Sequence, residues 1–218
     1  MKREQKTRKE IVRIGRLLYD KGFVAANDGN ISVKLDKNTI LTTPTGVSKG
    51  FMKPGMMVKV DLEGNILAGK LKPSSELKMH LEVYRQRPDI RAVLHAHPPV
   101  ATAFAVAGKP LNKPVLPEIV LTLGKIPLAR YGTPSTEEVP KAIREYIKTN
   151  DALLLANHGV LTIGEELVIA LYKMERVEHY ARISLYAKLL GGEQELPSDE
   201  LEKLYQIRKQ MNINNNPL

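Results

Sequence analysis

The 218-residue chain contains no cysteine and no tryptophan. The lack of cysteine excludes both a disulfide framework and a thiol nucleophile. No apolar run approaches the roughly 18 residues that a membrane-spanning helix needs, and no secretory signal sequence is recognisable. These absences predict a cytoplasmic protein that makes no contact with a membrane.

Aromatic residues are also scarce, at 5 % of the chain, whereas 33 Lys+Arg against 24 Asp+Glu give a formal net charge of +9. Such a charge can attract nucleic acid, an acidic membrane surface or a phosphorylated metabolite. Apart from a basic cluster within residues 2–9, the positive charges are scattered, and few rings are available to stack on bases. Nucleic acid is therefore only a minor alternative, and charge alone does not choose among the other anions.

Hydrophobic periodicity predicts a mixture of helices and strands. Residues 3–22 carry a helical apolar stripe, and residues 31–35 and 39–42 alternate on either side of a turn, as in an antiparallel hairpin. Further strands are expected at 57–62, 91–95, 118–122, 152–155 and 159–163. Further helices are expected near 75–86, 99–107, 136–149, 165–190 and 198–210.

No repeat, low-complexity tract or linker divides the chain, and its length suits one large domain that buries about 70 % of its unfolded surface. We therefore expect a single α/β domain over residues 1–218, with helices packed on a sheet that begins antiparallel. Residues 212–218 have little to bury and are predicted to form a frayed tail.

Three of the five histidines follow apolar strand candidates: His95 and His97 end the run at 91–94, and His158 follows 152–155. Residues i and i+2 of a strand share a face, so two imidazoles can converge on one ion at about 2.0–2.1 Å. Three protein ligands leave one coordination position open, which is typical of a catalytic zinc site. A single histidine at a strand end is more often an ordinary polar residue. Three of them, with no competing cysteine, predict a divalent-metal site.

Three polar loops have the composition of anion sites. Residues 72–77 (Lys-Pro-Ser-Ser-Glu-Leu) place a proline and two serines where a helix should start, so free N–H groups and hydroxyls are available there. Residues 29–30 (Gly-Asn) and 43–46 (Thr-Pro-Thr-Gly) are turns of small residues, which let backbone amides approach a phosphate closely. Taken singly, the first loop is explained equally well as an ordinary helix cap, and each of the other two is more often just a turn.

Glu76 falls in the first turn of the helix predicted at 75–86, with His80 one turn later on the same face. A carboxylate in that place could orient a histidine, bind metal or act as a base. An ordinary capping carboxylate is the alternative. The residues alone leave these roles open.

Taken in order, the Gly-Asn turn, the Thr-Pro-Thr-Gly turn, Pro-Ser-Ser-Glu, His95-Ala96-His97 and Asn157-His158-Gly159 resemble the class II aldolase/adducin family, in particular its fuculose-phosphate aldolase type. The resemblance covers about residues 5–205. It implies a single-domain α/β/α sandwich with a central, largely antiparallel sheet. It also implies a metal-dependent aldolase that cleaves a ketose 1-phosphate, such as L-fuculose 1-phosphate, to dihydroxyacetone phosphate and a small aldehyde.

The resemblance assigns roles to single residues. His95, His97 and His158 would hold one Zn²⁺ per chain, with Mn²⁺ or Co²⁺ as alternatives. Glu76 would move the proton at carbon and could also contact the metal in the resting enzyme. The family further implies a homotetramer with sites at subunit interfaces. The substrate phosphate would be bound by the remaining matched residues, which are Gly29, Asn30, Thr45, Gly46, Ser74 and Ser75.

Two departures from the family pattern concern the aldehyde. The fuculose-phosphate enzymes use a tyrosine from a neighbouring subunit as a second proton donor, but residues 114–118 read Pro-Val-Leu-Pro-Glu, and the tail offers only Tyr205. Lactaldehyde, acetaldehyde and glycolaldehyde therefore all stay open as the aldehyde.

Other functions occur on the same scaffold. A methylthioribulose-1-phosphate dehydratase is the nearer rival, and a pentulose-phosphate 4-epimerase is less favoured because that group has aspartate where this chain has Glu76. An interaction protein or a nucleic-acid-binding module is a distant alternative, against which the three intact histidines argue.

Overall fold

A computed structural model describes residues 2–211, and residues 212–218, predicted as a frayed tail, lie outside the described residues. The strands are β1 (Asn30–Lys34), β2 (Ile40–Thr42), β3 (Val58–Val60), β4 (Ile66–Ala68), β5 (Ala92–Ala96), β6 (Leu128–Ala129), β7 (Ala152–Leu155) and β8 (Gly159–Gly164). The α-helices are α1 (Lys2–Asp20), α2 (Leu77–Gln86), α3 (Pro99–Val106), α4 (Pro117–Thr122), α5 (Glu138–Ile143), α6 (Leu167–Leu189) and α7 (Ser198–Gln210). Short 3-10 helices are η1 (Lys49–Phe51), η2 (Pro54–Met56) and η3 (Tyr146–Lys148).

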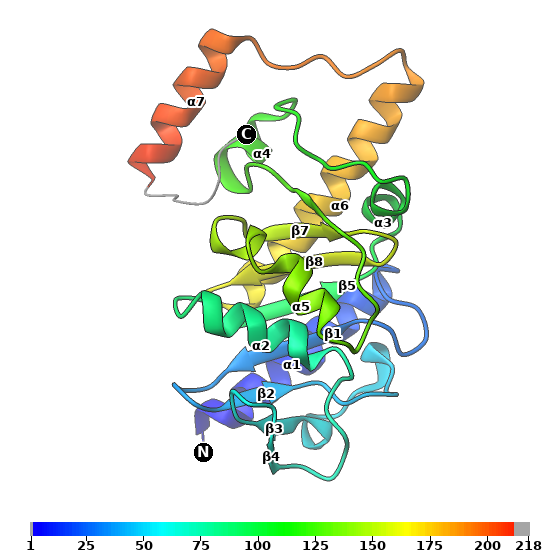
Figure 1. The fold of residues 1–218 in the computed structure, drawn as a ribbon, viewed down its shortest axis with the longest axis vertical. Coiled ribbons are helices and arrows are strands. Elements are labelled where there is room, and N and C mark those ends of the chain that lie inside the picture. The colour runs from blue at the N-terminus through cyan, green and yellow to red at the C-terminus, as the bar shows by residue number, and fades with distance from the viewer. Residues whose placement is uncertain (1, 212–218) are drawn as a thin grey trace.

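The strands form one sheet in the order β4-β3-β2-β1-β5-β8-β7-β6, and helices cover both of its faces (Figure 1). Neighbouring strands are antiparallel except β6 and β7, which are parallel. The predicted fold class, an α/β/α sandwich with a largely antiparallel sheet, is confirmed. The hairpin predicted from residues 31–35 and 39–42 is confirmed as β1 and β2.

The two faces of the sheet carry separate hydrophobic cores, because alternate strand residues point to opposite faces. On β5, Leu94 belongs to the core shared with α1, α3 and α6, whereas Val93 belongs to the core shared with α2 and α5. His95 lies two residues beyond Val93. It therefore shares the face that α2 and α5 cover.

One predicted strand is wrong, since residues 118–122 lie in helix α4. Pro117 occupies its first turn, where a missing N–H costs nothing, and Glu118 favours a helix N-terminus. A short continuous apolar run has no period that separates a strand from a helix. The helix predicted at 136–149 is divided into α5 and η3, and the short strands β4 and β6 were not expected.

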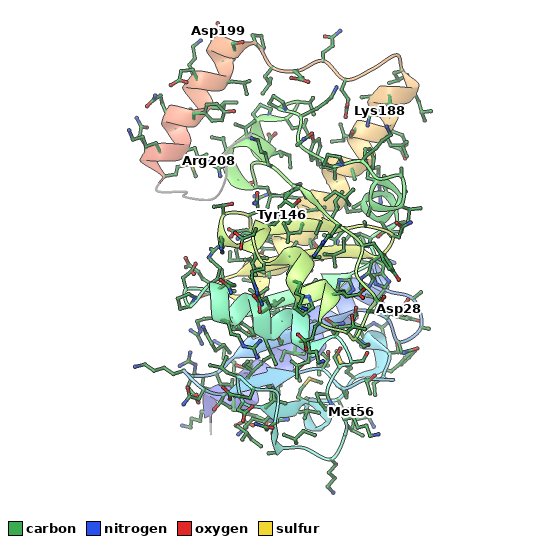
Figure 2. The ribbon with its side chains drawn as sticks, in the orientation of Figure 1. Asp28, Met56, Tyr146, Lys188, Asp199 and Arg208 are labelled. Atoms are coloured by element: carbon green, nitrogen blue, oxygen red, sulfur yellow. The ribbon has the colours of Figure 1, made fainter. Side chains whose placement is uncertain are left out.

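The C-terminal part of the described chain lies beyond the sheet. Helix α7, which carries Arg208 (Figure 2), packs against α4. The guanidinium of Arg208 donates a hydrogen bond to the carbonyl of Val120. The last turns of α6 also extend beyond the sheet (Figure 1). None of the helices in residues 2–211 is long and apolar enough to cross a membrane.

Candidate metal centre and active site

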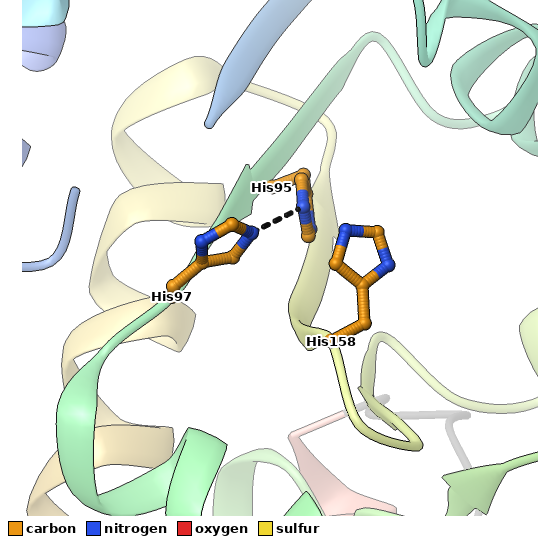
Figure 3. A group of neighbouring side chains, drawn as sticks. All are labelled: His95, His97 and His158. Atoms are coloured by element: carbon orange, nitrogen blue, oxygen red, sulfur yellow. Dashed lines mark hydrogen bonds between the residues drawn. The ribbon is translucent and has the colours of Figure 1, made fainter. Parts of the chain in front are cut away.

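Three histidines meet where β5 ends and β7 turns into β8 (Figure 3). His95 lies in β5 with a fully buried side chain, while the side chains of His97 and His158 are 27 % and 12 % exposed. One nitrogen of each ring lies within 4.8 Å of the others. The predicted convergence of these histidines is confirmed.

The conformation of the turn that carries His158 is set by the adjacent residues Asn157 and Gly159. The amide of His158 donates to the carbonyl of Leu155 at 3.0 Å, and Asn157 adopts a left-handed φ of 55°, which asparagine tolerates. Gly159 then opens β8 directly beneath the other rings. A Cβ at this position would lie 2.5 Å from the ring of His97. Only glycine therefore lets the hairpin approach the end of β5 this closely.

The backbone and a carboxylate orient two of the rings. Nδ1 of His95 lies 2.9 Å from the carbonyl of Val160, so it carries the hydrogen and Nε2 carries a lone pair. Nδ1 of His97 faces the carboxylate of Asp28 at 3.6 Å, which favours the same tautomer. These tautomers direct both Nε2 lone pairs into the space between the three rings.

The two Nε2 atoms are 3.1 Å apart, the contact drawn as a dashed line in Figure 3. A hydrogen bond between these atoms would require one ring to carry its hydrogen on Nε2 instead of Nδ1. That ring would then lose the hydrogen bond that its Nδ1 donates. Two nitrogen ligands of a tetrahedral zinc ion, with bonds of about 2.0–2.1 Å, are separated by roughly 3.3–3.4 Å. The donor set thus fits a divalent cation between the rings.

The protonation states of the histidines suit a metal as well. Burial is the main cause that lowers the pKa of His95 to about 3, and the neighbouring histidines lower it further. Burial, followed by the charge of His158, also lowers the pKa of His97. Neutral imidazole is the form that binds a metal ion. Near neutral pH His95 and His97 therefore present lone pairs rather than positive charges.

Glu76 precedes α2 and makes no capping hydrogen bond with its side chain, so the capping alternative does not describe it. Its Oε2 lies 3.5 Å from Nε2 of His95, and its Oε1 lies 3.0 Å from Nε2 of His158. Burial tends to raise the pKa of this carboxyl, but the charge of His95, the closeness of His158 and the amide of Asn30 together hold it well below its usual range. Glu76 is therefore an anion beside the cluster.

One oxygen of this carboxylate lacks a hydrogen-bond donor. Oε1 of Glu76 is buried, and no group within residues 2–211 is aligned to donate to it. A buried anionic oxygen normally has a partner, and an orphaned one calls for an explanation. A cation held by the three histidines would supply that partner.

Asn30 holds the other oxygen. Its Nδ2 donates to Oε2 of Glu76 at 2.8 Å, and its Oδ1 lies 2.5 Å from Nε2 of His80. Glu76 therefore does not orient His80 directly, because Asn30 lies between them. Both ends of the Asn30 side chain are bonded within the protein, and its predicted contact with a phosphate stays a prediction.

Two of the predicted anion loops lie side by side next to Glu76. The amide of Ser74 donates to the carbonyl of Thr43, and the amide of Thr45 donates to that of Lys72, each at 3.1 Å. The hydroxyl of Ser74 also accepts the amide of Glu76 at 3.3 Å, as a residue at a helix start does. Segments 43–46 and 72–76 thus form one platform.

The third predicted anion loop, residues 29–30, lies next to the histidines. Gly29 has a left-handed φ of 72°, and a Cβ there would lie 2.9 Å from the carbonyl of His95. Several small donors of the three loops are open to solvent while Glu76 is largely buried. The exposed ones are Thr45, Gly46 and Ser75.

Lys49 is a member of this region that the sequence analysis did not single out. Its side chain is almost fully buried, and Nζ donates to the carbonyls of Asn27 and Val47 at 2.8 and 2.7 Å. Burial lowers its pKa to about 8. A buried lysine that bonds two loops keeps the turn at 27–30 next to the turn at 43–47.

Comparison with known proteins identifies relatives of this site and fold. Residues 9–185 match the family described as Class II Aldolase and Adducin N-terminal domain. The chain is 39 % identical to an L-fuculose phosphate aldolase of Methanococcus maripaludis over 80 % of this chain and 94 % of that protein. It is 35 % identical to a 3-oxo-tetronate 4-phosphate decarboxylase of Haemophilus influenzae over 79 % of this chain and 84 % of that protein.

A solved structure has the same fold as this chain. Escherichia coli YgbL, whose activity is described as aldolase, epimerase or decarboxylase, superposes with a TM-score of 0.85 at 33 % identity, covering 92 % of this chain and 98 % of that one. The relatives thus divide between an aldolase and a decarboxylase, and the second activity was not among the alternatives weighed from the sequence.

Proposed function

This chain belongs to the class II aldolase and adducin family, and we propose that it is a lyase that cleaves the bond between the α and β carbons of the ketone in a phosphorylated sugar. The carrying observation is the anionic Glu76 beside a cluster of three converging histidines. The favoured reaction is reversible cleavage of L-fuculose 1-phosphate, or a related deoxyketose 1-phosphate, to dihydroxyacetone phosphate and a small aldehyde.

We assign the metal as Zn²⁺, one per chain, held by His95, His97 and His158. Mn²⁺ or Co²⁺ would suit the same ligands. When bound, the ion supplies positive charge beside the oxygens of the enediolate that carbon–carbon cleavage leaves. Three histidine nitrogens would leave one coordination position for substrate, as in a catalytic zinc site, and this supports the assignment.

Glu76 carries the proton at carbon. In the direction of synthesis, its carboxylate takes a proton from the hydroxymethyl carbon of dihydroxyacetone phosphate, and the electrons of that C–H bond form the enediolate. The enediolate carbon then bonds to the aldehyde carbon, whose oxygen gains a proton. Cleavage runs through the same steps in reverse. Glu76 is an anion before the reaction, as a base must be, and this state supports the role.

The loops beside Glu76 bind the phosphate in this proposal. Thr45, Gly46 and Ser75 are exposed at the edge of the site, where a phosphate can be held without full desolvation. Binding energy from this remote group positions the reacting carbons. The proposed ligands are Gly29, Asn30, Thr45, Gly46, Ser74 and Ser75.

Decarboxylation is the second candidate, which the relative from Haemophilus influenzae supports. A 3-oxo-tetronate 4-phosphate carries its carboxyl next to the carbon that adjoins the ketone. Loss of CO₂ leaves the electron pair of the broken bond on that carbon and gives the same enediolate, which takes one proton to become dihydroxyacetone phosphate. The two candidates share every step of Glu76 and differ only in the departing half.

One set of assays separates the candidates. Zinc-loaded protein is incubated with dihydroxyacetone phosphate in D₂O, and exchange of the hydroxymethyl hydrogen is followed by NMR. Aldehyde release from L-fuculose 1-phosphate and CO₂ release from 3-oxo-tetronate 4-phosphate are then measured. We expect exchange and aldehyde release. CO₂ release without aldehyde release would replace the aldolase by the decarboxylase, and the absence of all three signals would reject the lyase.

We also propose that the protein forms a homotetramer with its sites between subunits. The last turn of α6 supports an interface, since Leu189 and Leu190 are 75 % and 88 % exposed. Burying such side chains is favourable. Light scattering that finds only a 24.4 kDa monomer would contradict this assembly.

A further inference from the structure

Behind Glu76, a row of polar side chains runs through the interface between β1 and α2. Asn30 and Ser32 are alternate residues of β1 and share a face, while His80 and Tyr84 lie one turn apart on α2. All four are at most 3 % exposed. Polar groups are costly in such a place unless each one is paired.

Each of them is paired with the next. Oδ1 of Asn30 lies 2.5 Å from Nε2 of His80, and Nδ1 of His80 lies 2.7 Å from Oγ of Ser32. That Oγ lies 2.8 Å from the hydroxyl of Tyr84. With the bond from Asn30 to Glu76, these contacts make four hydrogen bonds in series, which we call the relay.

The chemistry of the first member sets the direction of every bond. The carboxylate of Glu76 can only accept, so the amide nitrogen of Asn30 must face it. The amide oxygen then faces His80, which must donate from Nε2. A neutral imidazole that donates from Nε2 accepts at Nδ1.

The same reasoning continues to the end of the relay. Ser32 must give its only hydrogen to Nδ1 of His80, so its oxygen accepts from the hydroxyl of Tyr84. Burial lowers the pKa of His80 to about 4 and raises the pKa of Tyr84. The imidazole therefore stays neutral and the phenol stays a donor near neutral pH, as this direction requires.

We propose that His80 is a positioning residue: its Nε2 hydrogen, fixed by Ser32 and Tyr84, orients the amide of Asn30 so that Glu76 is held by one oxygen only. Oε2 is thereby bonded, and Oε1 is left without a donor beside His158. Oε1 would contact the cation in the resting site, and it is the oxygen that exchanges a proton with the substrate once the substrate has taken its place beside the ion. This inference rests on the proposed role of Glu76 as the proton carrier.

The test uses graded variants of the full-length, zinc-loaded protein. We expect His80→Leu to lower kcat by about 10–100-fold, because a misplaced catalytic group costs up to about 10²-fold. Ser32→Ala should cost less and Tyr84→Phe least, since each lies further from Glu76. KM and metal content should change less than about twofold. His80→Gln, whose amide can still donate, should recover part of the lost kcat.

Matched controls separate positioning from packing. Tyr180→Phe removes another buried tyrosine hydroxyl, bonded to the carbonyl of Lys113, and Ser184→Ala removes another buried serine hydroxyl. If Tyr84→Phe and Ser32→Ala lower kcat no more than these controls, the positioning role is wrong. Both are mild changes, so the test holds even if His80→Leu does not fold.

A second measurement needs no substrate. In protein labelled with ¹⁵N-histidine, NMR should find His80 neutral with its hydrogen on Nε2, and Ser32→Ala should weaken that preference. A hydrogen on Nδ1, or a charged ring at neutral pH, would overturn the relay. A protein without lyase activity but with this tautomer would instead contradict the proposed function and leave the direction of the relay intact.

Discussion

The two sides of Glu76 are built differently. On one side, buried imidazoles have their tautomers set by a backbone carbonyl and a carboxylate, and the relay holds the carboxylate from behind. On the other side, the loops at 43–46 and 72–76 are joined by backbone hydrogen bonds and leave Thr45, Gly46 and Ser75 open to solvent. The groups proposed for chemistry are fixed before substrate arrives, whereas those proposed for binding await it. Substitutions on the two sides should therefore differ in which kinetic constant they change.

The largest effect is expected on the histidine side. His97→Ala removes one of three metal ligands, so the metal content should fall from about one ion per chain to near zero and activity should be lost with it. Elemental analysis and the lyase assay measure both. His179→Ala, at an exposed histidine of α6, is the control and should change neither. Unchanged metal content in His97→Ala would exclude this cluster as the metal site.

Glu76→Gln should come next. It keeps the size of the side chain but removes the proton acceptor, so kcat should fall by about 10²–10⁴-fold while metal content and phosphate affinity change little. Exchange of the hydroxymethyl hydrogen of dihydroxyacetone phosphate with D₂O reports the step directly. Glu82→Gln, at a carboxylate within α2 that is bonded to Arg144, is the control. Exchange at the wild-type rate in Glu76→Gln would remove Glu76 as the base.

Ser75→Ala probes the loop side and should show the opposite kinetic pattern. If its hydroxyl donates to a charged phosphate oxygen, binding of dihydroxyacetone phosphate should weaken by about 1.5–3 kcal/mol, roughly 10–150-fold, with kcat nearly unchanged. Titration calorimetry measures the affinity. Ser198→Ala at the start of α7 serves as control. A loss in kcat with unchanged affinity would place Ser75 on the chemical side.

The smallest effect concerns Lys49, which holds two loops together from inside. Its pKa is lowered from 10.5 to about 8 by burial, so the unfolded chain binds more protons than the folded one between these pH values. This difference makes the free energy of unfolding rise with pH across that window. Lys49→Met should lack that rise, whereas Lys37→Met, at an exposed lysine, should keep it.

Urea denaturation at several pH values between about 8 and 10.5 measures the effect of Lys49. The difference in unfolding free energy between wild type and Lys49→Met should grow in favour of wild type as the pH increases. A difference that stays constant with pH would show that burial does not perturb this lysine.

The histidine cluster could be predicted because each part of the signal is local. The period of a strand places His95 and His97 together, and an apolar run ending at a short turn carries His158 to the same edge. The pairing of β5 with β8 joins segments that are far apart in the sequence. Both are nevertheless recognisable as buried strands with histidines next to their ends.

The relay could not be predicted, although its spacing is visible afterwards. Asn30 and Ser32 are two apart, as on a strand, and His80 and Tyr84 are four apart, as on a helix. Which helix covers which strand depends on the packing of the two cores, and no local pattern states it. For the same reason nothing in the sequence distinguishes the buried Lys49 from the exposed lysines.

Gly159 helps to distinguish related sequences that can form this histidine cluster from those that only carry the three histidines. A side chain there would strike the ring of His97 and the carbonyl of Ala96, so the imidazoles could not close around a common centre. A chain that kept all three histidines but replaced this glycine would retain the motif and lose the geometry. The sequence feature that identifies the histidine cluster thus includes Gly159, a residue that is not itself a metal ligand.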